Sequence, residues 1–236
     1  MILEKLLRRL SHYYFSAEVR GLENIPEGPC LLVGNHSGIG LLNPEIWIFG
    51  TSYLEKHNRL AVLGHDLVLR VPGIAQLAVK FLRYIPNNFE SARAALQRGK
   101  HVLVYPGGSW ESCRPWRDRD KIDFKNRTGY LKLAREAGVS IVPVVAAGAH
   151  DGLFVWSRGE KIARALRLHR FFRIDVFPLG LSFPFFIHVG PIWPFIPFPR
   201  KVIVEVLPAM VVNERADEVE RKMQEALTKN AGELRR

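Results

Sequence analysis

Short apolar runs alternate with amphipathic stretches along the first two thirds of the chain. The apolar runs predict buried strands at 29–33, 101–105 and 141–146. The stretches between them predict helices at 45–55, 74–81, 89–96 and 129–137. Because strands alternate with helices, we expect an α/β fold with a central, mainly parallel or mixed sheet flanked by helices.

The later part of the chain carries weaker periodic signals. We expect strands at 173–177 and 201–207, and a charged, exposed C-terminal helix over 213–236. We find no internal repeat, low-complexity tract or linker, so 1–236 is predicted to form a single domain.

The N-terminus, residues 1–16, has the pattern of an amphipathic helix. Apolar residues recur there at helical spacing, opposite basic ones: Ile2, Leu3, Leu6, Leu7 and Leu10 against Lys5, Arg8 and Arg9. The continuous apolar core of a signal peptide is missing. We expect either an interfacial helix lying on a membrane or a helix packed on its own domain, and the pattern fits both.

The segment 177–199 carries no formal charge and is rich in Phe, Trp and Ile. It is long enough to span a bilayer, but its six prolines exclude a regular spanning helix. We expect an irregular, aromatic-rich surface that enters the membrane interface or walls an acyl-chain groove. The alternative is an ordinary buried loop on the sheet.

The net charge of the chain indicates which class of molecule it binds. The 236 residues carry a net charge of +11, which favours an anionic partner. The basic residues are scattered and accompany no nucleic-acid module, so we expect an anionic membrane surface and no nucleic acid. The two cysteines, Cys30 and Cys113, indicate neither a disulfide framework nor a metal site, and fit a reducing compartment.

Two turns carry candidate chemistry. The first is Asn35-His36-Ser37, which follows a buried strand and leads into a glycine-rich stretch. Acyl transfer to an alcohol needs a base of near-neutral pKa at a place that a hydroxyl can approach, and His36 is such a candidate. A histidine at a strand end is usually structural, however, so this motif alone is weak.

The second turn runs from Tyr105 through Pro106, Gly107 and Gly108 to Glu111. Its glycines offer unhindered amide groups to a developing oxyanion or to phosphate. A strand followed by Pro-Gly-Gly is also an ordinary turn.

Together, in this order and about seventy residues apart, the two motifs resemble those of the glycerolipid acyltransferase superfamily. The Tyr-Pro-Gly-Gly-x-x-Glu variant is closer to its diacylglycerol-acyltransferase-like branch and to bacterial relatives. Further matches lie at 65–66, 71–73, 114–116, 122–124, 129–130 and 141–144, and the resemblance covers roughly 20–208. It implies a glycerol-phosphate-acyltransferase-like core in which His36 is the general base. It also implies a thioester of coenzyme A or acyl carrier protein as donor.

The chain departs from the family pattern at the acid that pairs with this histidine. The usual position, five residues after His36, holds Leu41, and the next acid is Glu45. If the glycine-rich turn bulges, Glu45 reaches Nδ1 of the imidazole and leaves Nε2 basic. We expect Glu45 in this role, with Asp66, Glu111 or no acid partner as alternatives.

A second departure concerns the acceptor. Phosphate-binding members carry glutamate and arginine where this chain has Gly108 and Trp110, so a neutral or bulkier lipid hydroxyl is favoured over a lysophosphatidic acid. We expect the oxyanion or substrate to be bound at five positions: Asn35, Ser37, Gly107, Gly108 and Glu111. Three arginines are candidates for the donor's phosphates, or form a solvated cluster: Arg114, Arg117 and Arg119.

The sequence thus predicts a peripheral enzyme on the cytoplasmic face of the cell membrane that moves a fatty acyl group from a thioester to a lipid alcohol. We expect no metal and no cofactor beyond the acyl-CoA or acyl-carrier-protein co-substrate. The alternatives are a catalytically impaired lipid-binding protein of the same fold and an acyl thioesterase.

Overall fold

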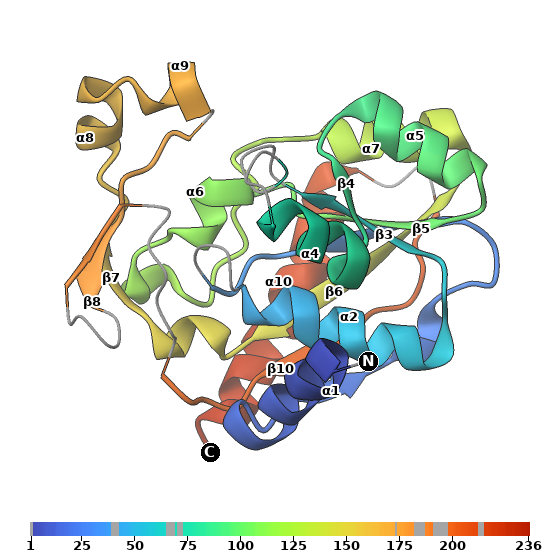
Figure 1. Ribbon diagram of the computed structural model, residues 1–236, viewed down its shortest axis with the longest axis horizontal. Coiled ribbons are helices and arrows are strands. Elements are labelled where there is room, and N and C mark those ends of the chain that lie inside the picture. The colour runs from blue at the N-terminus through green and yellow to red at the C-terminus, as the bar shows by residue number, and fades with distance from the viewer. Residues whose placement is uncertain are drawn as a thin grey trace.

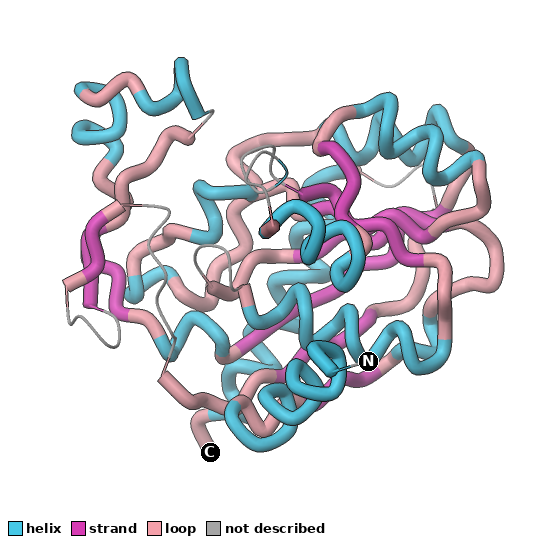
Figure 2. Tube along the Cα trace, in the orientation of Figure 1, coloured by secondary structure: helices cyan, strands magenta, loops and turns pink. Residues whose placement is uncertain are grey.

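The computed structural model describes residues 2–38, 43–64, 69, 73–172, 174–181, 187–190, 198–211 and 215–236. A seven-stranded sheet runs through its centre (Figures 1 and 2). Its strands lie in the order β1 (Glu18–Arg20), β10 (Ile203–Val206), β6 (Ser140–Ala147), β2 (Cys30–Gly34), β5 (His101–Val104), β3 (Leu60–Gly64) and β4 (Tyr84–Pro86). All neighbours pair in parallel except β10 and β6. The predicted mainly parallel α/β sheet is confirmed.

Helices cover both faces of this sheet. On one face lie α1 (Ile2–Arg9) and α2 (Pro44–Lys56), and on the other α5 (Phe89–Gln97), α7 (Gly129–Ala137) and α10 (Ala216–Leu234). The sheet is also accompanied by α4 (Ile74–Leu82) and the short α6 (Gly108–Ser112). Alternate residues of β2 enter the two cores, Leu32 on the α2 side and Leu31 on the other. Burial on both faces explains why the central strands form continuous apolar runs in the sequence.

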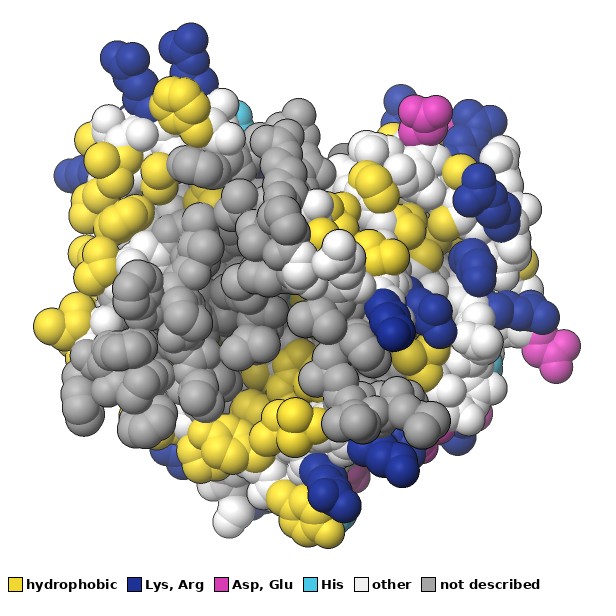
Figure 3. Space-filling model, viewed as in Figure 1, with side chains coloured by type: hydrophobic (Ala, Val, Ile, Leu, Met, Phe, Trp, Pro, Cys, Tyr) yellow, Lys and Arg dark blue, Asp and Glu magenta, His cyan; other side chains and the backbone are white. Residues whose placement is uncertain are grey.

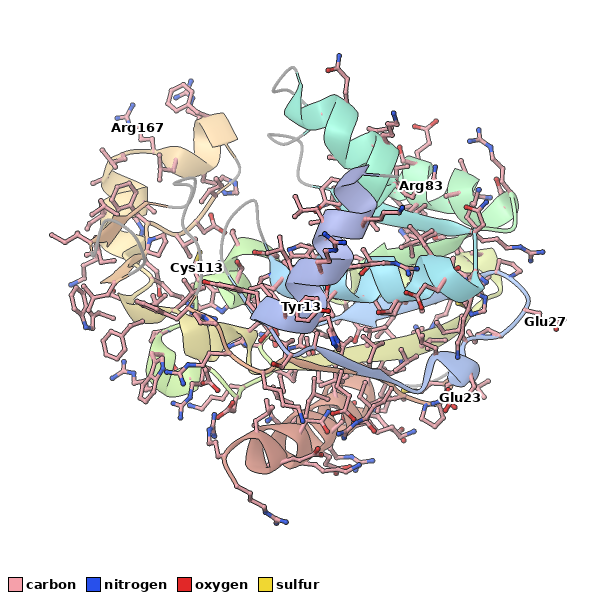
Figure 4. The ribbon with its side chains drawn as sticks, turned by 60° about the horizontal axis from the view of Figure 1, so that its bottom comes forward. Tyr13, Glu23, Glu27, Arg83, Cys113 and Arg167 are labelled. Atoms are coloured by element: carbon pink, nitrogen blue, oxygen red, sulfur yellow. The ribbon has the colours of Figure 1, made fainter. Side chains whose placement is uncertain are left out.

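A second, smaller sheet stands beside the first. It is antiparallel and consists of β7 (Phe154–Ser157), β8 (Leu179–Leu181) and β9 (His188–Val189). Two short helices, α8 (Glu160–Ala165) and α9 (Leu168–Phe172), complete what we call the lobe, residues 153–190 (Figure 1, left). Its small core includes Cys113, which lies between the lobe and the main sheet (Figure 4).

The lobe corrects two sequence predictions. The strand expected at 173–177 is wrong: Ile174 and Val176 alternate inward as in a strand, but among the described residues that stretch has no ladder partner. The segment 177–199 was expected to be irregular, yet it contains β8 and β9. Its remaining parts at 182–186 and 191–197 lie outside the described residues.

The N-terminal helix packs on its own domain and also presents apolar side chains to solvent. Leu7 and Tyr14 pack against the core, and Arg8 pairs with Glu55 at 2.6 Å. Leu6 is half exposed, and Tyr13 is 80% exposed on the same segment (Figure 4). Among the described residues, we find no helix that combines the length and the apolar character needed to cross a bilayer.

Candidate active site

His36 lies just beyond the carboxyl end of β2, at the edge of the sheet where the parallel strands β5 and β6 also end. The preceding residue ties this turn to the neighbouring strand. The side chain of Asn35 donates to the carbonyl of Ala146 at 3.0 Å and accepts from its amide at 2.8 Å. Asn35 is fully buried, and these two hydrogen bonds hold the turn in place.

The ring of His36 forms a dyad with Glu45. Nδ1 of His36 lies 3.0 Å from Oε1 of Glu45, in the first turn of α2. Glu45 is 1% exposed, whereas the His36 side chain keeps 11% of its surface open. The amino end of a helix favours a negative charge, so α2 suits an ionised Glu45. The contact expected between Glu45 and the imidazole is present, and Nε2 receives no hydrogen bond from any described residue.

Two further side chains contact this ring, and sequence reasoning missed both. Asn43, directly before α2, places its Nδ2 2.9 Å from Nδ1 of His36. The ring of Tyr105 stacks on the imidazole, with centroids 4.4 Å apart and planes 15° apart. Burial and the nearby Glu45 raise the pKa of Tyr105 well above its ordinary value, so its hydroxyl stays neutral.

Gly34 makes room for this stack. A Cβ at Gly34 would lie 2.6 Å from Cε1 of Tyr105, which is closer than two carbon atoms can pack. Only glycine therefore fits at the end of β2 while the Tyr105 ring lies against His36.

The backbone of His36 is held by two residues of the second motif, which we call the Glu111–Arg114 clamp. Oε2 of Glu111 accepts the His36 amide at 2.9 Å, and Nη1 of Arg114 donates to the His36 carbonyl at 2.7 Å. The two side chains are fully buried and lie 3.9 Å apart as an ion pair. Burial raises the pKa of Glu111 to about 7, although Arg114 opposes the shift. Nearby, Ser112 donates to the carbonyl of Gly38 at 2.7 Å.

In this clamp Arg114 has a structural task that the sequence did not predict. Its guanidinium donates to the carbonyls of His36, Glu111 and Arg119, and the side chain has no exposed surface. A buried guanidinium bonded in this way is not accessible to a donor phosphate. Binding of a donor phosphate by Arg114 would require its guanidinium to leave these carbonyls, so this arrangement does not support that expectation.

The other two arginines of the cluster are less buried: Arg117 is exposed, and the Arg119 side chain is 18% exposed. Arg117 is exposed in the short turn Trp116–Asp118. Arg119 stacks on Trp116 at 3.8 Å and pairs with Asp151 at 2.8 Å. Donor phosphate binding by these two stays a prediction.

The five expected oxyanion or substrate positions have different surroundings. Asn35 and Glu111 are buried and bonded to the main chain. Ser37 is buried, and its hydroxyl accepts the amide of His150 at 3.3 Å. The Gly108 amide donates to the Tyr105 carbonyl at 3.1 Å. Among the described residues the Gly107 amide has no main-chain acceptor, and neither have the amides of Ser109 and Trp110 in the same turn.

A further buried group near His36 is His150, which the sequence analysis did not predict. Its Nε2 lies 2.9 Å from the carbonyl of Arg114. Burial, together with the charge of Arg114, lowers the pKa of His150 to about 3, so its ring is neutral at physiological pH. Through its contacts with Ser37 and with the Arg114 carbonyl, His150 helps to hold the turns around His36, and it is not a second base.

The remaining expectations concern the alternative acid position and a metal site. Asp66, the alternative acid, and Leu41, at the family's usual acid position, lie outside the described residues. Within the described part of the chain, no group of three or more His, Cys, Asp or Glu side chains is placed to hold a metal ion.

Proteins that are similar in sequence to this chain include an uncharacterised bacterial protein and an enzyme named for the synthesis of storage lipids. An uncharacterised protein of Mycobacterium tuberculosis is 28% identical over 205 residues, which cover 85% of this chain and 53% of that protein. The "DGAT1/2-independent enzyme synthesizing storage lipids" of Gallus gallus is 29% identical over 178 residues, covering 75% and 50%. The chain spans about half the length of these curated relatives.

A plant protein and a solved structure are also similar to this chain. "Phytyl ester synthase 2, chloroplastic" of Arabidopsis thaliana is 30% identical over 141 residues, covering 56% of this chain and 20% of that protein. The crystal structure of the 1-acyl-sn-glycerophosphate (LPA) acyltransferase PlsC from Thermotoga maritima has the same fold. It matches with a TM-score of 0.57 at 19% identity, covering 99% of this chain and 78% of that one.

The family itself is shown by a match over more than half of the chain. The family model described as acyltransferase matches residues 16–147, which include His36, Glu45 and the turn at Gly107. The resemblance seen in the two motifs is thus confirmed, and the chain belongs to the acyltransferase family.

Proposed function

We propose that this protein is a membrane-associated O-acyltransferase that moves a fatty acyl group from an acyl thioester to a lipid hydroxyl. The observation that carries the proposal is the His36–Glu45 dyad, with 3.0 Å between Nδ1 and Oε1 and with no described residue hydrogen-bonded to Nε2. The names of the relatives, which speak of storage lipids and phytyl esters, support lipid acyl transfer.

The dyad explains how His36 acts as a base. With a proton on Nδ1 donated to Glu45, Nε2 carries the lone pair. A protonated Nδ1 cannot accept from the Asn43 amide nitrogen 2.9 Å away, so this tautomer requires the Asn43 amide in the reversed orientation, with its oxygen towards Nδ1. As Nε2 accepts the acceptor's hydroxyl proton, the imidazole becomes positively charged and the Glu45 carboxylate stabilises that charge. Stacking by Tyr105 limits rotation of the ring, so the lone pair keeps its direction during transfer.

His36 takes the proton from the acceptor and later returns it to the leaving group. The acceptor oxygen attacks the thioester carbonyl as its proton moves to Nε2, which forms the new C–O bond and a tetrahedral oxyanion. Collapse of that intermediate breaks the C–S bond, and the imidazolium returns the proton to the leaving thiolate. Of the predicted oxyanion donors, the Gly107 amide keeps a free N–H among the described residues and is our candidate.

The acceptor proposed here is a neutral lipid alcohol. Trp110, at the position where phosphate-binding members carry arginine, lies between Lys125 and Arg158, each within 4.4 Å of its ring centroid. These cations are occupied by the ring and by Asp123, which pairs with Arg158. The donor is a thioester of coenzyme A or of acyl carrier protein.

The test is a transfer assay with radiolabelled acyl-CoA or acyl carrier protein and a panel of lipid hydroxyls. We expect His36→Ala to lower turnover roughly 100- to 10,000-fold, and Glu45→Ala to lower it at least about tenfold. The matched controls are His169→Ala and Asp175→Ala, because these residues form a histidine–carboxylate pair at 2.7 Å on the exposed lobe. Both controls should keep normal turnover.

Three outcomes would count against the proposal. Near-normal turnover of Glu45→Ala would move the acid role to another residue. Free fatty acid formed at equal rates with and without lipid would indicate a thioesterase. Lipid binding with no transfer to any hydroxyl would indicate an impaired, lipid-binding member of the family.

A further inference from the structure

The outer face of the lobe's sheet is apolar where such a face is normally polar. Along β7, Val155 is buried in the lobe core, whereas Phe154 and Trp156 are 39% and 54% exposed. Phe154 pairs with Leu181 of β8, and across the next strand pair Leu179 lies opposite Val189. Antiparallel sheets with one face in water usually carry polar residues there, so this face is built for contact with something else.

Aromatic rings extend the face towards the second motif. Trp116 and Phe154 lie 5.5 Å apart between ring centroids, and Phe154 and Trp156 lie 5.9 Å apart. Trp116 is itself 37% exposed. Three adjacent exposed rings on one surface are enough to anchor it to an apolar phase.

The neighbouring helices supply positive charge. Lys161, Arg164 and Arg167 are exposed on and after α8, and Arg167 lies at the outer end of the lobe (Figure 4). The described acids of the lobe are Glu160 and Asp175, and Asp175 already pairs with Lys125 at 3.2 Å. In Figure 3, hydrophobic side chains gather along the left edge over the lobe, and Lys and Arg side chains project above it.

We propose that the lobe docks on an anionic lipid bilayer through this surface, with the aromatic face of β7–β9 in the interface and the basic residues of α8 on the headgroups. Exposed Trp and Phe beside Lys and Arg are the combination that interfacial lipid binding uses. An acidic protein would be drawn to the charges but would not account for the apolar sheet face, so we commit to the bilayer.

Docking at this surface would also orient the active site. Arg158, next to β7, donates to the carbonyl of Trp110 at 3.1 Å and lies 4.2 Å from its ring centroid. Trp110 belongs to α6, the helix that also carries Glu111 of the clamp. The lobe is thus joined to the turn that holds His36. This consequence rests on the proposed function, whereas binding to the bilayer does not.

The test measures binding of the full chain to vesicles by sedimentation, without turnover. The vesicles are phosphatidylcholine alone, or phosphatidylcholine with about one third phosphatidylglycerol. We expect the triple variant Lys161→Gln/Arg164→Gln/Arg167→Gln to bind the anionic vesicles about a hundredfold more weakly, about fivefold for each basic residue. The matched control neutralises three exposed basic residues on or directly after α5 and on α7, on the far side of the molecule: Arg93→Gln/Arg98→Gln/Lys132→Gln. Its binding should change by no more than about threefold.

The apolar contribution is tested separately. Phe154→Ser/Trp156→Ser should weaken binding to both kinds of vesicle at least about tenfold. Phe89→Ser is the control, because Phe89 on α5 has the same 39% exposure as Phe154.

Each other result overturns the proposal. Equal vesicle binding by the lobe variants and their controls would exclude the lobe as the docking surface. Dissociation of a dimer by Phe154→Ser/Trp156→Ser in analytical ultracentrifugation would make a second copy of the chain the occupant. Binding to acidic acyl carrier protein but not to vesicles would make that protein the occupant. Transfer measured with detergent-dispersed substrates keeps the two proposals apart, because it tests His36 chemistry without a bilayer.

Discussion

Removing the carboxylate of Glu111 should damage both stability and catalysis, because this fully buried side chain holds the backbone of His36. The clamp gives this residue two tasks. It accepts the amide of His36 at 2.9 Å and that of Asp123 at 3.3 Å, and it lies 3.9 Å from the buried guanidinium of Arg114. Glu111→Ala removes both the acceptor and the countercharge.

The stability loss follows from the burial of Arg114. A fully buried charge that loses its partner destabilises a protein by roughly 3–5 kcal/mol. Each main-chain amide that loses its acceptor adds about 1–3 kcal/mol. Against a total free energy of unfolding of about 5–15 kcal/mol, Glu111→Ala should leave a marginally folded protein. Glu111→Gln also removes the countercharge but keeps an acceptor for one amide, so it should lose about 1–3 kcal/mol less than Glu111→Ala.

The catalytic loss follows from movement of the His36 peptide. Without Glu111 the amide of His36 is free to shift, and a displacement of about 1 Å at a catalytic group lowers turnover roughly a hundredfold. We therefore expect Glu111→Ala, assayed at a temperature where it is fully folded, to lower kcat by about that factor. Its KM for the donor should stay near the wild-type value, because Glu111 does not bind the donor.

The assays are urea unfolding followed by circular dichroism, and transfer kinetics under folded conditions. Glu225→Ala is the control, since Glu225 pairs with Arg221 at 2.6 Å on the surface and should lose less than about 1 kcal/mol. The double variant Glu111→Ala/Arg114→Met should recover stability but not kcat, because it removes the unpaired charge without restoring the clamp. A Glu111→Ala protein as stable as Glu225→Ala, or with a kcat within about threefold of wild type, would refute this reasoning.

Two further predictions use the same region. Gly34→Ala should lower kcat at least about tenfold, because the new methyl group would displace the Tyr105 ring and with it His36; a normal kcat would show that the stack is dispensable. The pKa of Glu111, about 7 instead of the ordinary 4.5, means that the folded protein keeps a proton that the unfolded chain releases. The free energy of unfolding should therefore fall as pH rises from about 4.5 to 7, by up to about 1.4 kcal/mol per pH unit. Urea unfolding at several pH values should show this slope in wild type and a smaller one in Glu111→Gln, and equal slopes would contradict the assignment.

The sequence predicted the buried parts of the fold better than its margins. The strands β2, β5 and β6 and the helices α2, α5 and α7 were expected close to their observed bounds, because burial on both faces of a sheet leaves continuous apolar runs. β1 and β4 have only three residues each and are partly exposed, so they leave no comparable signal. The run at Leu60–Gly64 is apolar enough to predict β3 but was not assigned.

The strands of the lobe could not be predicted from the sequence for a different reason. Its strands are short, and β8 and β9 are joined through a proline-containing segment that reads as loop. The exposed Phe154 and Trp156 also look like core residues in a sequence, since composition alone does not reveal which face of a strand meets solvent.

Within the active site, contacts inside one local turn could be predicted and contacts across the sheet could not. Glu45 was expected near His36 because both residues flank one glycine-rich turn. Tyr105 and Glu111 contact His36 only because β5 lies next to β2, and a sequence does not state strand order. Glu111 was therefore expected to face a substrate, whereas its carboxylate accepts the main-chain amide of His36.

Glu45 lies beyond the family's usual acid position, and the contacts made by Nδ1, the ring face and the peptide of His36 together explain why. Nδ1 is held by Glu45 of α2, the ring face by Tyr105 after β5, and the peptide by Glu111 and Arg114 of the second motif. What a base needs from its acid partner is a carboxylate at hydrogen-bonding distance from Nδ1, and the amino end of α2 supplies one at that point. The number of residues between His36 and the acid matters only through where that helix begins. A carboxylate nine positions away is therefore chemically equivalent to one five positions away, provided that α2 starts beside the end of β2.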